Sequence, residues 1–342
     1  MNPITPLTQL DVRNATPRVL HLVGVCFFAI IMIIQTASAD WREHRDTAMT
    51  TDIVLKLWDE PEFDSTRLFA DAMREFKRIE KTYSAYREDN PLAYVNQNAA
   101  RGPVKVDEEM FLLFEQAAQL FKQTQGAFDV TFLSAGYRYD FRASQRPDNV
   151  ELVELGDLID FRRVVLDSAN KTVAYSADGV RVGFGGLGKG FAVERVAALW
   201  RAAGVRFAQI SAGGDSRFIG DHNGRPWTIG VQDPRQNDAV AAILPVANEA
   251  VSTSGDYQRF FVEDGVRYHH ILDPNTGDSA RRMRSATVIG PDATLTDGLA
   301  TGVFVLGLTD GLELIDNTAG FEAVIVDNNG EIHYSSGFSE SK

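Results

Sequence analysis

Strand-like and helix-like segments alternate from residue 40 to residue 342, and no linker, repeat or low-complexity tract separates them. Residues 52–58 alternate apolar and polar side chains as a half-buried strand does, and residues 65–86 carry apolar side chains at helical spacing. A second helix, over 106–126, begins near an aspartate and ends at a glycine. This uninterrupted pattern predicts one large α+β domain with mixed or antiparallel sheets and helices, in one lobe or two.

The rest of the chain continues the alternation. The predicted elements are an antiparallel meander over 162–186, a helix over 188–205, a strand, turn and strand over 207–220, a strand over 226–234, a helix over 295–316 interrupted by Gly307, and a strand over 322–328.

Charge limits the ligands that such a domain can bind. The 342 residues carry a formal net charge of −13, with 44% apolar and 24% charged residues. A nucleic-acid binder needs a surplus of basic side chains to neutralise phosphates, and this chain has none. A phosphorylated ligand would therefore be held by glycine-rich backbone, by a few placed cations or by a divalent metal ion.

The first 39 residues have the composition of an export signal. Arg13 and Arg18 precede an apolar run over 19–34, and Ala37 and Ala39 form an A-x-A-like cleavage site before Asp40. The sequence predicts cleavage after Ala39 and a periplasmic protein, and the alternative is an uncleaved segment that anchors the chain to the inner membrane.

The single cysteine, Cys26, lies inside this apolar run. The mature chain would then contain no cysteine, which excludes disulfides, cysteine nucleophiles and thiolate metal ligands.

Two glycine-rich segments could bring backbone close to a ligand. Residues 183–190 lead from a strand into a helix, where unpaired N–H groups and Lys189 favour an anion, although a plain tight turn explains the glycines as well. Residues 211–220 form a second glycine turn with Asp215 predicted at its tip, and an ordinary hairpin is the more common explanation.

Asp297 and Thr301 are four residues apart in a predicted helix, so both oxygen donors lie on one face. One carboxylate with neutral oxygens is a usual set of ligands for Mg²⁺. The alternative is an ordinary helix start, with Thr294 or Thr296 as N-cap and Asp297 facing the helix dipole.

His269 and His270 are adjacent in a predicted strand and should point to opposite faces. One can serve a site, and the other is expected at the surface. His270 lies nearer the Asp-Pro turn and is the candidate acid or base; an exposed histidine without a role is the alternative.

Eight short motifs occur in order along the chain: AMTT at 48–51, YSAYRED at 83–89, GAFDVT at 126–131, GGLGKGFAVER at 185–195, SAGGD at 211–215, TSGDY at 253–257, HHILDPNTG at 269–277 and TDGLAT at 296–301. Together they resemble the ApbE family, the FAD:protein FMN transferases. The resemblance implies a magnesium-dependent enzyme that cleaves FAD, releases AMP and attaches FMN to a Thr or Ser hydroxyl of a partner protein. Exported flavoproteins of membrane redox complexes are the partners that it suggests.

The same resemblance assigns the site. It implies that FAD is held by Met49, Tyr86, Ala127, Phe128, Asp129, Lys189 and Ile271, and the metal by Asp297, Thr301 and a main-chain oxygen of Gly186. His270 is the predicted base for the acceptor hydroxyl, with Asp256 and Asp273 as the competing carboxylates.

Three positions depart from the family pattern. Gly183 stands where an acidic residue is usual, Thr50 where a glycine is expected, and Asn90 where a serine is common. Two other functions therefore stay open: an enzyme that only hydrolyses FAD to FMN and AMP, and a non-catalytic periplasmic flavin-binding protein.

Overall fold

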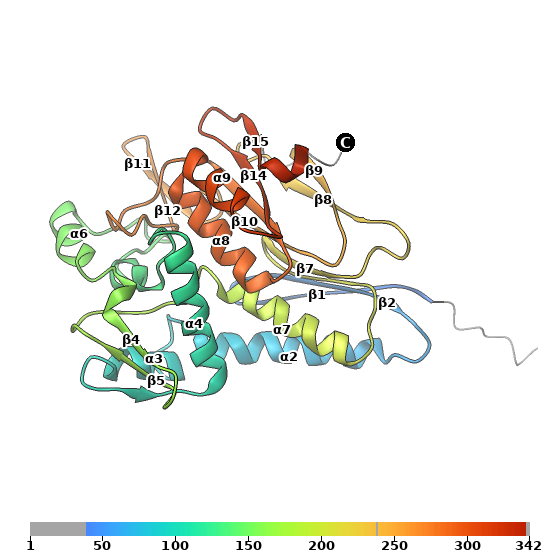
Figure 1. The fold of residues 1–342 in the computed structure, drawn as a ribbon, viewed down its shortest axis with the longest axis horizontal. Helices are drawn as coiled ribbons and strands as arrows, with labels where there is room; N and C mark the ends of the chain where they lie inside the picture. Colours follow the sequence, from blue (N-terminus) through green and yellow to red (C-terminus); the bar gives the residue numbers. More distant parts are fainter. Residues whose placement is uncertain (1–38, 237–238, 340–342) are drawn as a thin grey trace, which may run out of the picture.

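The computed structural model describes residues 39–236 and 239–339, and an eight-stranded antiparallel sheet runs through it (Figure 1). In spatial order the strands are β1 (Asp40–Ala48), β2 (Thr51–Asp59), β6 (Ala208–Ala212), β7 (Asp215–Ile219), β10 (Ala250–Gly255), β13 (Ser285–Gly290), β14 (Glu322–Val326) and β15 (Ile332–Tyr334). The predicted α+β class with antiparallel sheets is confirmed. The predicted export signal, apart from Ala39, lies outside the described residues.

Three helices, α2 (Ser65–Tyr83), α7 (Gly188–Ala202) and α8 (Ala293–Leu306), cover one face of this sheet (Figure 1). The helix α2 buries one apolar side, which includes Phe76, whereas α8 is buried almost all round. A helix enclosed on most sides carries mainly apolar and small residues, which agrees with the composition of α8. Gly307, with φ of 92°, ends α8 before α9 (Leu308–Asp316), so the predicted interruption is confirmed.

The opposite face of the sheet carries a second, smaller core. The ribbon of β8 (Trp227–Gln232) and β9 (Val240–Val246) packs there. Successive strand residues point to opposite faces, so Val288 enters the main core under the helices while its neighbour Ile289 enters the smaller core.

A three-stranded sheet with the order β3 (Val104–Lys105), β5 (Thr172–Tyr175), β4 (Val164–Asp167) forms a separate layer beside α4 (Glu108–Gln123) (Figure 1). The predicted meander is correct for two strands and wrong for the third. Residues 180–183 are not a strand, because side chains rather than a neighbouring strand hydrogen-bond to their backbone. Asn96 Oδ1 accepts from Val182 N, and Ser134 Oγ accepts from Arg181 N.

The remaining elements complete the layers. They are α3 (Pro91–Asn98), β3 (Val104–Lys105), α4 (Glu108–Gln123), α5 (Leu133–Gly136), α6 (Asn149–Gly156), β4 (Val164–Asp167), β5 (Thr172–Tyr175), β11 (Phe260–Glu263), β12 (Val266–His269), and short 3₁₀ turns at Val130–Phe132, Phe161–Arg163 and Ser336–Ser339. Across residues 39–236 and 239–339, none of the helices combines the length and the apolar character needed to cross a bilayer.

The turn between β1 and β2 is strained. Ala48 pairs with Thr51, so Met49 and Thr50 alone form the turn, with φ of 53° and 58°. Two consecutive positive φ values match the type I′ hairpin turn, which glycine and asparagine favour. A β-branched threonine in the left-handed region costs about 1–2 kcal/mol. This strained tip reaches the cavity described next.

Candidate functional site

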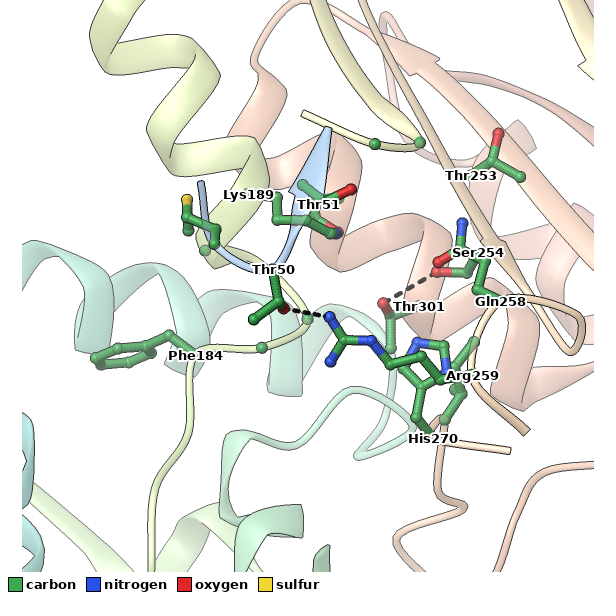
Figure 2. Close-up of a pocket in the computed structure, with 18 of the residues that line it drawn as sticks. Thr50, Thr51, Phe184, Lys189, Thr253, Ser254, Gln258, Arg259, His270 and Thr301 are labelled. Atoms are coloured by element: carbon green, nitrogen blue, oxygen red, sulfur yellow. Dashed lines mark hydrogen bonds and ion pairs between the residues drawn. The ribbon is translucent and has the colours of Figure 1, made fainter. Parts of the chain in front are cut away.

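One cavity of about 770 Å³ lies where the main sheet, α7, α8 and the segment after α4 meet. All eleven residues predicted for the site line it: Met49, Tyr86, Ala127, Phe128, Asp129, Gly186, Lys189, His270, Ile271, Asp297 and Thr301. Its volume is within the usual range for a small-molecule site. Figure 2 shows several of its walls, which come from segments far apart in the chain.

A close approach of α7 and α8 places the two helices' polar groups together. A Cβ atom on Gly190 would lie 2.1 Å from the Ala293 carbonyl oxygen, so only glycine fits there. The Gly190 N–H donates to Asp297 Oδ2 at 2.9 Å. Burial, followed by the nearby Asp215 carboxylate, raises the pKa of Asp297 to about 7.

Lys189 at the start of α7 is held by two carboxylates. It forms an ion pair with Asp215, and its Nζ lies 3.9 Å from Asp297 Oδ1. Burial disfavours the ammonium, but both carboxylates outweigh it and raise the pKa of Lys189. The prediction that Asp215 lies at the tip of a hairpin turn is wrong: Gly213 and Gly214 form the tip, and Asp215 is a buried residue of β7.

Two oxygen donors of α8 and the backbone of Gly186 line the same cavity and are the groups available to a hard cation. Asp297 and Thr301 lie one turn apart on α8, and Thr301 Oγ1 is 3.4 Å from where a Cβ atom of Gly186 would be. Thr301 Oγ1 is also 3.2 Å from Ser254 Oγ (Figure 2). A carboxylate, a hydroxyl and a main-chain carbonyl match the ligands that Mg²⁺ prefers, so the donor set fits the predicted metal.

The alternative role for Asp297 as a group at the helix start is wrong. Asp292 is the N-cap of α8, since its side chain accepts from Leu295 N at 2.9 Å. Thr294 and Thr296 lie inside the helix, and both are buried. Asp297 is 3% exposed, so it is a buried carboxylate rather than a surface cap.

His270 follows β12 directly and faces the cavity near Arg259 and Thr301 (Figure 2). Its backbone N–H donates to the Arg259 carbonyl at 3.2 Å. Its buried ring atom Nδ1 has no hydrogen-bond partner among the described residues. Burial lowers the pKa of His270 to about 3, with further contributions from His269, Arg259 and Lys189. The imidazole is therefore neutral near pH 7.

The expectation of a surface position for His269 is wrong. His269 is 2% exposed, and its Nε2–H donates to the Ala280 carbonyl at 2.5 Å. Ile271 N donates to its Nδ1 at 3.3 Å, and Ser279 Oγ accepts from its backbone N–H. The chain returns after the Asp-Pro-Asn-Thr-Gly loop, so that Ser279 and Ala280 bond to His269, and Phe304 packs on its ring.

The competing carboxylates do not line the cavity. Asp256 forms a two-point ion pair with Arg235, at 2.8 and 2.6 Å. Asp273 Oδ1 accepts from the backbone and side chain of Asn275 within the loop. Both carboxylates stabilise turns next to the site.

Asp129 shapes the cavity wall by accepting backbone hydrogen bonds. Oδ1 accepts from the N–H and hydroxyl of Thr131, and Oδ2 accepts from Phe161 N at 2.8 Å. Burial raises the pKa of Asp129 to about 6, although these hydrogen bonds oppose the rise. Its carboxylate is thus occupied by the protein, and it joins the Thr131 turn to Phe161.

Asp129→Asn is expected to lower the free energy of unfolding by about 1–3 kcal/mol, because the amide NH₂ would face the Phe161 N–H donor and leave it without an acceptor. Urea denaturation measures this. Asp157→Asn, at an exposed position nearby, is the control and should stay within about 0.5 kcal/mol of the original chain. Equal stability of both variants would contradict the structural role of Asp129.

The three departures from the family pattern have local explanations. A Cβ atom on Gly183 would lie 3.2 Å from Leu133 Cδ2 and 3.4 Å from Ala85 Cβ, so apolar neighbours occupy the space of an acidic side chain. Asn90 caps α3, since its Oδ1 accepts from Ala93 N at 2.7 Å. Thr50 accepts a hydrogen bond from Arg259.

Several cavity residues were not predicted from the sequence. Ser254, Gln258 and Arg259 line the wall beside His270 and belong to the segment that begins with the TSGDY motif. Their positions could have been inferred from that motif. Thr253, the first residue of that motif, and Phe184, in the glycine-rich segment 183–190, also line the cavity.

Comparison with known proteins gives a consistent result. The model of the ApbE family matches residues 49–325. The FAD:protein FMN transferase of Treponema pallidum is 32% identical over 277 residues, which cover 75% of this chain and 76% of that protein. The protein of the same name from Vibrio cholerae is 30% identical, with 74% of this chain and 77% of that protein covered.

Solved structures agree in fold. The ApbE protein of Thermotoga maritima has a TM-score of 0.81 and 33% identity, covering 88% of this chain and 99% of that one. The flavin transferase ApbE of Vibrio cholerae has a TM-score of 0.80 and 27% identity, covering 89% and 99%. The family match contains all eleven cavity residues predicted from the motifs. The resemblance is confirmed, and the chain belongs to the ApbE family.

Proposed function

We propose that this protein transfers FMN from FAD to a Thr or Ser hydroxyl of an acceptor protein, with Mg²⁺ and with release of AMP. The observation that carries the proposal is the convergence of a neutral histidine, an oxygen donor set and a glycine-rich helix start on one cavity. The relatives named FAD:protein FMN transferase support it.

In this reaction the acceptor oxygen forms a bond to the flavin-side phosphorus of FAD, and the bond between that phosphorus and the bridging oxygen breaks, so that AMP leaves. Bound Mg²⁺ would supply neutralisation of the charge that develops on the phosphates. Asp297, Thr301 and the Gly186 carbonyl would hold it.

The chain's own residues perform the other tasks. His270 is neutral and lines the cavity, so it takes the proton of the acceptor hydroxyl as the new bond forms. The strained Met49–Thr50 tip and the buried Ala127–Phe128 pair shape the cavity around the substrate. Tyr86, 78% exposed at the cavity margin, offers an aromatic face.

One incubation separates the proposed function from its alternatives. The protein is mixed with FAD, Mg²⁺ and a candidate exported flavoprotein, and AMP is measured together with flavin fluorescence on the denatured partner. AMP with a fluorescent partner is the expected result. AMP without labelling would favour an FAD hydrolase, and FAD binding without AMP would favour a flavin-binding protein.

We propose further that the protein is exported to the periplasm, where it meets flavoproteins of a membrane redox complex. The first strand begins at Asp40, directly after the predicted cleavage site, so cleavage there would keep the whole of β1 in the mature chain. N-terminal sequencing of protein exported by a bacterial host should give Asp40 as the first residue. A retained Met1 would favour the membrane anchor instead.

A further inference from the structure

Arg259 differs from the other basic group of the cavity wall. Lys189 and Arg259 are the lysine and arginine that line the cavity, and Lys189 is neutralised by Asp215 and Asp297. Arg259 forms no ion pair with a carboxylate in residues 39–236 and 239–339; its guanidinium donates to the neutral Thr50 hydroxyl at 2.5 Å. In a protein with a net charge of −13, an arginine that lines a cavity without a carboxylate partner is suited to an anionic ligand.

The position of Arg259 connects the two sides of the cavity mouth. Its carbonyl accepts from His270 N, so its main chain supports the proposed base. Its side chain crosses from the segment after β10 to the tip of the β1–β2 hairpin (Figure 2). The guanidinium therefore lies over the cavity, beside His270 and near Thr301.

The Thr50 contact is one that an anion can replace. A hydrogen bond to a neutral hydroxyl is weaker than a charge-assisted bond to a phosphate oxygen, and a guanidinium can bind phosphate through two parallel N–H groups. Arg259 and Thr50 are both exposed, so neither is locked in place by packing. Exchanging the hydroxyl for a phosphate would thus strengthen the interaction.

We propose that Arg259 binds the diphosphate of the dinucleotide substrate, and that Thr50 holds the guanidinium over the cavity before the dinucleotide binds. This inference rests on the proposed function, since it takes FAD as the substrate. Thr50 is one of the three positions that depart from the family pattern. The proposal gives it a role that glycine could not fill, because glycine has no hydroxyl.

The test compares FAD with riboflavin, which has the same ring system and no phosphate. Arg259→Gln is expected to weaken FAD binding by tenfold or more, since it removes a charge-assisted contact, and to leave riboflavin binding within about threefold. The FAD affinity of Arg259→Lys should fall between those of Arg259→Gln and of the original protein, because lysine retains the charge and loses the two-point geometry. Arg101→Gln removes the same charge at an exposed position outside the cavity wall and should bind FAD as the original protein does.

The outcomes separate the inference from the proposed function. Unchanged FAD affinity in Arg259→Gln, in a protein that still transfers flavin, would overturn the role of Arg259 alone. An equal loss of FAD and riboflavin affinity in both Arg259 variants would show a structural role and also overturn it. If the original protein bound no FAD and released no AMP, the proposed function would fail and this inference with it.

Discussion

His270→Asn is expected to lower the single-turnover rate of flavin transfer by a hundredfold or more, while FAD affinity stays within about threefold. A base positioned at the attacking hydroxyl contributes about 10²–10⁴-fold. Burial lowers the pKa of His270 to about 3, so the ring is already deprotonated at neutral pH in the structure. Asparagine retains a polar group of similar shape but cannot accept the proton.

Asp273→Asn is the matched comparison, because Asp273 is the competing base in the same loop and an asparagine side chain preserves its turn. It should transfer flavin at nearly the original rate. Normal transfer by His270→Asn together with a collapsed rate in the Asp273 variant would reverse the assignment.

His269→Ala cannot serve as a control without effect on the fold, because His269 is buried and not at the surface as the sequence predicts. Its ring bonds to Ala280 and Ile271 are buried, so His269→Ala should lower the free energy of unfolding by about 1–3 kcal/mol. A urea titration distinguishes this loss of stability from a loss of base function.

Asp297→Asn is expected to reduce AMP release at saturating FAD by about a thousandfold or more. Asp297 contributes the single carboxylate of the proposed metal-ligand set, and metal neutralisation of phosphate charge is worth several kcal/mol, at about 1.36 kcal/mol per tenfold in rate. Asparagine keeps an oxygen that can accept from Gly190 N, so the contact between α7 and α8 is retained. Alanine would also remove this buried acceptor and leave Gly190 N without its partner. Asp297→Asn is therefore the cleaner test of the metal role.

Asp292→Asn provides the control on the same helix, because asparagine and aspartate are equally good N-caps. This variant should release AMP normally across a Mg²⁺ titration. Full activity of Asp297→Asn at limiting Mg²⁺ would show that Asp297 is not a metal ligand.

Local signals predicted most of the secondary structure. The helix α4 begins after Asp107, whose side chain accepts from Met110 N, and the helix after Asp292 breaks at Gly307 as predicted. Caps and positive-φ glycines act through atoms a few residues away, so the sequence alone contains the information. The prediction of a third strand in the meander was wrong because the side chain of Asn96, over eighty residues away in sequence, supplies the hydrogen-bond partners of the Val182 backbone.

The ordered motifs of the sequence alone determined the family and eleven of the residues that line the cavity. Only the tertiary structure decided the environment of each. Lys189 begins α7, yet its charge is balanced by Asp215 from β7 and approached by Asp297 from α8. His269 and His270 are neighbours in the chain, but a returning loop encloses one and leaves the other facing the cavity. Burial and pairing depend on contacts between segments far apart in sequence, and these contacts set whether a carboxylate, an amine or an imidazole is charged.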